Sequence, residues 1–163
     1  MILGYKCFNK NLINNYNKTY EIGKKYEVSG EVKFGKNGNG FHFCKNLEDT
    51  LRYFDSFNED IDICKVIGSG DIKQYDDEYY GYYDMYVSSV IVILKKLTRK
   101  EIFDIIFNSS EFSVVRFISG YKLTDSELEM FEKKYMNNQT ILDAITYYYK
   151  DKDVYQKKYG LKR

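Results

Sequence analysis

Residues 85–101 read MYVSSVIVILKKLTRKE, and within them the pattern of the chain changes from strand to helix. The first part is rich in β-branched residues and is apolar at every position from Val90 to Leu94, which predicts a strand covered on both faces. Thr98 and Glu101 then have the spacing of a capping box, which opens a helix. Strand patterns dominate before this point and helix patterns after it, an order that is typical of an α+β fold.

Three further strands are predicted upstream, over Ile2–Phe8, Phe41–Cys44 and Ile61–Ile72. Gly68 and Gly70 interrupt the last of these and indicate a bulge or a close approach of another group to the backbone. Together with Met85 to Leu97, these segments predict a sheet that holds most of the first half of the chain.

Two turn signals lie between the first two of these strands. Ser29-Gly30 separates Lys25–Val28 from Glu31–Phe34, and this arrangement predicts a two-residue hairpin. The cluster Gly35–Gly40 has several positions that can take a positive φ angle, and we interpret it as a hairpin loop.

Asn46 is predicted to cap a helix that reaches about Phe57, because an asparagine at this position can accept a hydrogen bond from the first turn. Leu47, Leu51 and Phe54 fall on one face of that helix and would pack on the sheet.

The last third of the chain has helical patterns. Glu111–Ser119 fits a helix or a strand, Thr124 and Glu127 form a second capping box, and Thr140 is predicted to cap a last helix that includes Tyr148. We therefore expect a twisted, mainly antiparallel sheet with one packed helix, followed by a C-terminal helical region.

The chain has 163 residues, enough to bury a sizeable core without disulfides or metal. We expect an α+β sheet domain over residues 1–97 and a helical region over residues 98–163 that packs on it. No flexible linker marks the boundary.

The composition narrows the class of protein. The chain has 25 basic and 24 acidic residues, so no global field favours nucleic acid as a direct ligand. The longest apolar stretch, Val90 to Leu94, is too short to span a membrane, and we see no signal peptide. Three cysteines are an odd, sparse count, which is typical of free thiols in a reducing compartment. We expect a cytoplasmic protein.

A tyrosine-rich acidic segment is the candidate partner-binding surface. Tyrosine offers a large contact area with a polar tip, and the chain has 18 of them. We predict contacts to a protein partner, or else an ordinary solvated loop, for these residues: Asp76, Asp77, Glu78, Tyr79, Tyr80, Tyr82 and Tyr83.

Several segments together resemble a bacterial and phage domain family of unknown function, with a short Tyr-Lys-Gly-Phe-like first strand and a Gly-Phe-His-x-Cys strand. The segments are Gly4-Tyr5-Lys6-Cys7-Phe8, Tyr20–Tyr26, Gly40–Phe54, Cys64–Ile72 and Val87–Glu101. Cys7 stands where that family usually has glycine. The resemblance implies a home in phages, prophages and their hosts, and it brings no established chemistry.

The strand Phe41–Phe43 followed by Tyr53 is also similar to part of the ADP-ribosyltransferase fold, in which a helix tyrosine stacks on nicotinamide. This likeness implies a cleft for NAD that is lined by Tyr5, His42 and Tyr53. Tyr5 and Lys6 stand where that fold usually has histidine or arginine, and the sequence offers no clear catalytic glutamate.

Other chemistry is conceivable around the only histidine. His42 and Cys44 share one strand face, and a zinc site with Cys7 and Cys64 can be drawn, although ligands in such sites usually come in close pairs from tight turns. We instead interpret the cysteines as small buried apolar residues and predict no metal. Cys44 would need an oxyanion hole to act as a nucleophile beside His42, and none is visible.

Two functions follow from these observations. The first is a non-enzymatic protein-binding protein of phage or mobile-element origin, which would inhibit a host defence complex and need no cofactor. The alternative is a nucleotide-binding, ADP-ribosyltransferase-like enzyme with NAD as its cofactor. An open cleft beside Tyr53 and the first strand, with a glutamate opposite, would favour the enzyme; a region filled by Leu47, Leu51 and Phe54 would count against it.

Overall fold

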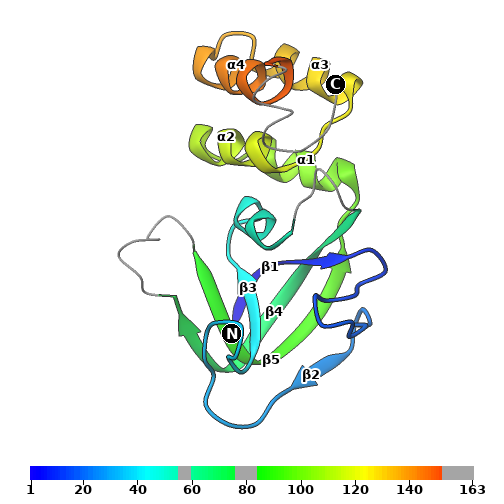
Figure 1. The fold of residues 1–163 in the computed structure, drawn as a ribbon, viewed down its shortest axis with the longest axis vertical. Helices are drawn as coiled ribbons and strands as arrows, with labels where there is room; N and C mark the ends of the chain where they lie inside the picture. Colours follow the sequence, from blue (N-terminus) through cyan, green and yellow to red (C-terminus); the bar gives the residue numbers. More distant parts are fainter. Residues whose placement is uncertain (55–59, 76–83, 152–163) are drawn as a thin grey trace.

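A computed structural model describes residues 1–54, 60–75 and 84–151, and it confirms the α+β fold (Figure 1). Its strands are β1 (Ile2–Asn9), β2 (Lys25–Glu27), β3 (Phe41–Cys44), β4 (Ile61–Gln74) and β5 (Met85–Lys96). Its helices are the 3₁₀-helix η1 (Glu48–Tyr53), the α-helices α1 (Arg99–Phe107), α2 (Glu111–Gly120), α3 (Asp125–Lys134) and α4 (Gln139–Ile145), and the π-helical turn η2 (Thr146–Lys150).

The sheet is antiparallel at each of its described pairings, as the sequence predicts, and it is built around β5. One side of β5 pairs with β4, and the other side pairs first with β3 and then with β2. Because β1 pairs with both β3 and β4, the strands β1, β3, β5 and β4 close into a ring. The ring brings the short strand β3 beside β1, where Tyr5 faces Cys44.

Glycines in β1 and β4 make room for the Phe43 ring. A Cβ atom at Gly68 would lie 2.4 Å from the Phe43 ring, and one at Gly4 would lie 2.8 Å from it. The ring is buried and stacks on Tyr86 at 5.6 Å between centroids. Gly70 has a φ of +73° within the register shift of β4, so the predicted bulge and close approach are both confirmed.

The predicted hairpin around Ser29-Gly30 is wrong. Gly30 has a positive φ, but β2 pairs with β5, where Tyr26 faces Ile91. The segment that follows is bridged to its own loop instead, through Lys33 and Asn39. The turn signal was real, but a neighbouring apolar strand offered the better partner for β2. The hairpin loop predicted at Gly35–Gly40 is confirmed by this bridge and by positive φ angles at Gly35 and Gly40.

The helix predicted from Asn46 to about Phe57 is also wrong in its type and in its cap. The described part contains only η1, whose N-cap is Leu47 and has no side-chain cap. Asn46 does not cap the backbone, because its side chain donates to a carboxylate oxygen of Asp49 at 3.3 Å. Residues 55–59, where the prediction continues, lie outside the described residues.

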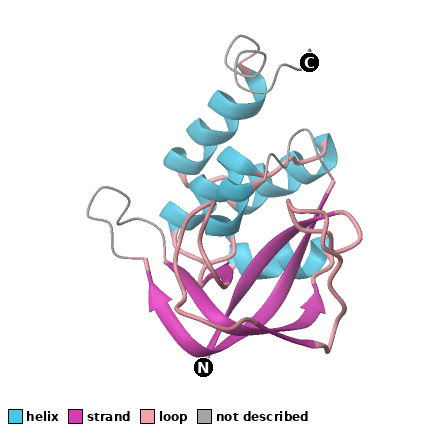
Figure 2. Cartoon of the chain, turned by 60° about the horizontal axis from the view of Figure 1, so that its bottom comes forward, coloured by secondary structure: helices cyan, strands magenta, loops and turns pink. Residues whose placement is uncertain are grey.

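The C-terminal helices lie together at one end of the molecule, with α1 and α2 nearer the sheet and α3 and α4 farther away (Figures 1 and 2). Both capping boxes are present, at Thr98 with Glu101 and at Thr124 with Glu127. The ambiguous segment at 111 is the helix α2, capped by Ser110.

The predicted cap of the last helix is wrong by two residues. The side chain of Asn138, and not Thr140, accepts the hydrogen bond from the first turn of α4. Both residue types can cap a helix, so the sequence alone offered two starting points.

One apolar core joins the helices to the sheet. It contains Phe103, Phe117 and Phe131 of the helices together with Ile63 of β4 and Leu47 before η1. A second core fills the sheet around Phe43 and Ile91. Over the described residues, none of the helices combines the length and apolar character needed to cross a bilayer.

Candidate functional site

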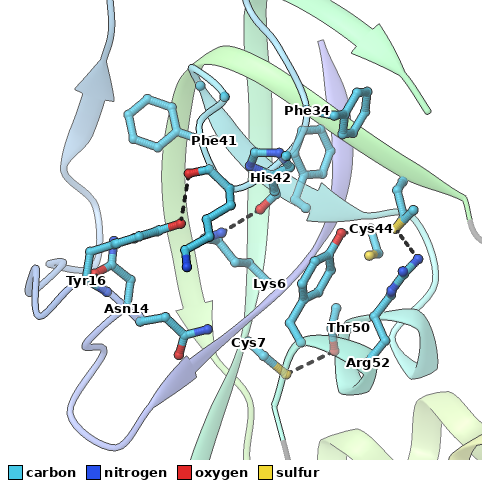
Figure 3. A pocket seen from close by; sticks show the side chains of 18 of the residues that line it. Lys6, Cys7, Asn14, Tyr16, Phe34, Phe41, His42, Cys44, Thr50 and Arg52 are labelled. Carbon is cyan, nitrogen blue, oxygen red and sulfur yellow. Dashed lines mark hydrogen bonds between the residues drawn. The ribbon is translucent and has the colours of Figure 1, made fainter.

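A pocket of about 620 Å³ lies beside β1 and β3, and its lining includes Tyr5, His42 and Tyr53 (Figure 3). This volume falls within the usual range of small-molecule sites, roughly 300 to 1,000 Å³. The structure therefore brings together the three residues that the sequence analysis named for a nucleotide cleft.

Strand pairing and the short helix η1 place these three residues. Tyr5 of β1 faces Cys44 of β3, two residues after His42, so both strands contribute to one wall. Tyr53 ends η1, and its hydroxyl donates to the sulfur of Met85 at 3.0 Å. Their positions depend on the closure of the strand ring, which no local sequence pattern encodes.

The space beside Tyr53 and β1 is a pocket and is not filled by leucine side chains. Leu47 and Leu51 are buried in the helical core and do not line the pocket, whereas Phe54 contributes to its wall. The first half of the condition for an enzyme, an open cleft beside Tyr53, is met. The second half is not, because none of the lining residues in the described chain is an aspartate or glutamate.

Four basic side chains line the pocket, although the chain as a whole has a net charge of only +1. Lys6 is half-buried, while Lys18, Lys36 and Arg52 are exposed. The pocket is locally positive, because basic side chains occur in both its half-buried part and its exposed part and the described lining residues include no carboxylate.

Lys6 is the deepest of these cations. Its Nζ donates to the backbone oxygen of His42 at 2.6 Å and lies 5.7 Å from the centroid of the Phe8 ring. Figure 3 shows it side by side with His42. Within the described residues, no carboxylate forms an ion pair with it. Burial lowers the pKa of Lys6 to about 8.

Aromatic rings gather at two places around the pocket. Phe34 packs edge-on against His42 at 5.4 Å and against Tyr75 at 4.9 Å between centroids. Elsewhere the Lys18 Nζ lies 5.1 Å from the Tyr20 ring and 5.8 Å from the Phe41 ring. These are the arrangements by which proteins hold planar and cationic groups.

The titratable groups of the wall shift toward their neutral forms. Burial, with a smaller effect from Lys6, lowers the pKa of His42 to about 4. Burial raises the pKa of Cys7 to about 12, and it also raises the pKa values of Cys44 and Tyr53. A wall with these properties is poorly solvated, so a charge inside it gains more from a counter-ion than it would in water.

The cysteines have structural environments. All three are buried and free, and the Cys7 thiol donates to the Thr50 hydroxyl at 3.0 Å. In the described ranges, no three histidine, cysteine or acidic residues gather closely enough to hold a metal ion. Raised thiol pKa values give Cys44 little thiolate at neutral pH, so it is a poor nucleophile.

Sequence reasoning missed the part of the site that comes from loops. Asn14, Tyr16 and Lys18 lie in an asparagine-rich loop, and Lys36 lies in the glycine-rich loop after Phe34. The Tyr16 hydroxyl donates to the Lys36 carbonyl at 3.4 Å, which joins the two loops beside the pocket (Figure 3). The sequence signal for this part of the site was the composition of the two loops, which are rich in asparagine or glycine, the residues that adopt positive φ angles most readily.

The predicted partner-binding residues lie outside the described residues. These are Asp76, Asp77, Glu78, Tyr79, Tyr80, Tyr82 and Tyr83. Their role stays a prediction.

A family model described as "Domain of unknown function (DUF7666)" matches residues 2–105. The match runs from β1 into α1 and includes all the residues that line the pocket. It confirms the expected likeness to a domain family of unknown function. A comparison with curated proteins gives no match.

Proposed function

We propose that this chain, which belongs to the DUF7666 family of domains of unknown function, binds a nucleotide in the pocket beside β1 and β3. The observation that carries the proposal is the combination of four basic side chains, many aromatic rings and no carboxylate among the described lining residues. Nucleotides present the matching features: a phosphate anion and a planar base.

Charge supports the anionic half of the ligand. Lys6 is held in a poorly solvated place, and its lowered pKa reports that its positive charge is unfavourable there. A phosphate beside it would restore a counter-charge, and charge-assisted hydrogen bonds of this kind are among the strongest in proteins. Lys18 and Lys36, which are exposed at the same pocket, can contact further phosphate oxygens.

Aromatic rings and an asparagine side chain of the pocket support the second feature of the ligand, its planar base. Tyr5, His42 and Phe34 offer surfaces against which a base can stack, and such stacking is worth roughly 1 to 3 kcal/mol per base. Asn39 lines the same pocket. Its amide nitrogen donates to the Ser29 and Glu31 carbonyls, so its Oδ1 is the atom that can accept a hydrogen bond from a base edge.

We limit this proposal to binding. ADP-ribosyl transfer, the reaction implied by the weaker resemblance, uses a glutamate, and the described lining residues include no carboxylate. NAD is a natural test ligand, because it combines two bases with a diphosphate.

Calorimetric titration with NAD, ADP and AMP tests the proposal. We expect saturable binding that Lys6→Met weakens by roughly tenfold or more, since a charge-assisted bond contributes about 1.5 to 3 kcal/mol. Lys65→Met is the matched control, because Lys65 is exposed on β4 and does not line the pocket. The absence of both heat and a thermal shift at millimolar ligand would contradict nucleotide binding.

We also propose, from the sequence, that the tyrosine-rich acidic segment contacts a protein partner with a basic surface. Four tyrosines among acidic residues at 76–84 support this role. In a phage or mobile element, such contacts would serve to inhibit a host defence complex. This proposal does not depend on the pocket.

A further inference from the structure

We infer that the Lys6 amine forms an imine with phosphate-bearing aldehydes or ketones that enter the pocket. This step goes beyond nucleotide binding, uses the same pocket, and requires only that a phosphate can dock there. It adds a covalent site to a pocket that otherwise holds its ligand by charge and stacking.

The position of Lys6 suits an attacking amine. Its Nζ reaches the pocket from β1, and one of its hydrogens is directed to the His42 carbonyl at 2.6 Å. Among the described residues there is no carboxylate paired with Nζ to hold it in the charged form. Figure 3 shows this hydrogen bond. When the amine is neutral, the bond uses one N–H, and the lone pair on the nitrogen is then available to a carbonyl carbon.

The surroundings of Lys6 increase the neutral fraction of its amine, although the charged form remains populated. Burial lowers the pKa of Lys6 to about 8, so a useful fraction is deprotonated near neutral pH. Lysines that are desolvated in this way are the ones proteins use to form Schiff bases. The cysteines of the same wall shift in the opposite direction and become less reactive, so Lys6 is the nucleophile that this environment favours.

The reaction balances without a further reactant. The lone pair of the neutral amine adds to the carbonyl carbon, and a proton moves from nitrogen to the resulting alkoxide, which gives a carbinolamine. Its hydroxyl group then takes up a proton and leaves as water as the C=N bond forms, and the nitrogen loses its remaining proton to solvent. Tyr5 and Tyr53, whose pKa values burial raises, stay neutral phenols during these steps, and solvent supplies the proton.

The chemical class of the ligand follows from the other lining residues. Lys18 and Lys36 provide positive charge for a phosphate, and the rings around Phe34 and Phe41 favour a flat or apolar body. Carbonyl compounds that also carry a phosphate satisfy both requirements. An aldehyde without phosphate lacks the group that would hold it near Lys6.

Pyridoxal 5′-phosphate is a suitable probe, since it has an aromatic ring, a phosphate and an aldehyde. The full chain is incubated with the probe, the imine is reduced with borohydride, and the modified lysines are mapped by mass spectrometry. We expect Lys6 to be modified roughly tenfold more than the exposed Lys65, and pyridoxal, which lacks the phosphate, to modify Lys6 much less. Modification spread evenly over the exposed lysines would overturn the inference.

Lys6→Arg tests whether the adduct is an imine of Lys6. Arginine cannot form the imine, so we expect the mapped adduct to vanish from this variant. ADP binding is measured separately on the parent protein, so that the two proposals can fail independently. Nucleotide binding without preferential labelling of Lys6 would reject the imine and leave the proposed function standing. Labelling of Lys6 without nucleotide binding would reject the proposed function and leave the imine standing.

Discussion

Lys6 places a positive charge in a half-buried position where the described chain supplies only a backbone carbonyl as its hydrogen-bond partner. The lowering of its pKa from 10.5 to about 8 means that the folded protein binds this proton less well than the unfolded chain does. A charged side chain that lowers the stability of the fold and lines a pocket is typical of a binding site. Such a residue is kept because it is needed for function, although folding alone would disfavour it.

Replacing Lys6 with methionine should stabilise the protein at pH 7. Below about pH 8 the Lys6 amine is protonated in both the folded and the unfolded protein, and its charge destabilises the fold by the full amount. Between pH 8 and 10.5 the folded protein has lost this proton, so the destabilisation becomes smaller as the pH rises. We expect Lys6→Met to raise the free energy of unfolding by roughly 1 to 2 kcal/mol at pH 7, and the gain to disappear toward pH 10.5. Urea denaturation across this pH range measures it.

The exposed control for this change is Lys65→Met, which should alter stability by no more than about 0.5 kcal/mol. If Lys6→Met left the protein equally stable or less stable at pH 7, the charge would not be unfavourable in the folded state, and this result would contradict the proposed role of Lys6 in binding an anion.

At the scale of the elements, the strand ring is the feature that creates the pocket. β3 is only four residues long and pairs with both β1 and β5, so the wall that holds His42 depends on a close fit around Phe43. Gly68 provides that fit, because any side chain there would meet the Phe43 ring. A glycine in a strand usually weakens it, and here the close packing of another ring explains its presence.

Gly68→Ala should therefore destabilise the fold. The added Cβ would lie 2.4 Å from the buried Phe43 ring, which stacks on Tyr86 and has little room to move. Overpacking of this kind costs about 1 to 3 kcal/mol, measured as a lower denaturation midpoint. The double variant Gly68→Ala with Phe43→Leu should lose less than the sum of the two single changes, and strict additivity would show that the two residues do not compete for the same space.

At the scale of the whole molecule, η1 connects the pocket with the helical region. Its last residues, Arg52 and Tyr53, line the pocket, while Asp49 on the same helix is fully buried and forms an ion pair with Arg116 of α2. Leu51 contacts α2 beside Gly120. The charge pair therefore joins η1 to α2, the apolar core joins the helices to the sheet, and the pocket wall is attached to both.

The tyrosine-rich acidic segment is predicted from the sequence to contact a protein partner. Replacing the tyrosines at 79, 80, 82 and 83 with serine should weaken capture of the partner from the native host roughly tenfold or more, because aromatic anchors dominate such interfaces. Tyr147→Ser is the control, since Tyr147 is an exposed tyrosine on η2. Full retention of partner capture by the quadruple variant would remove this segment from the interface.

The sequence by itself determined the features that depend on short-range patterns. The period of the apolar residues identified β1, β3, β4 and β5, and the spacing of Thr and Glu located two helix starts, because these signals arise from neighbouring residues. It also named Tyr5, His42 and Tyr53 as one cleft, through resemblance rather than spacing.

Only the tertiary structure decided where β2 pairs, what Asn46 bonds to and which charges share the pocket. Each of these depends on groups far apart in the chain: β2 and β5, the Asp49 carboxylate that Asn46 contacts and its partner Arg116 on α2, and lysines from β1 and two separate loops. Local propensity is similar for several alternatives at such positions, and the burial of apolar surface and charge by distant segments selects among them.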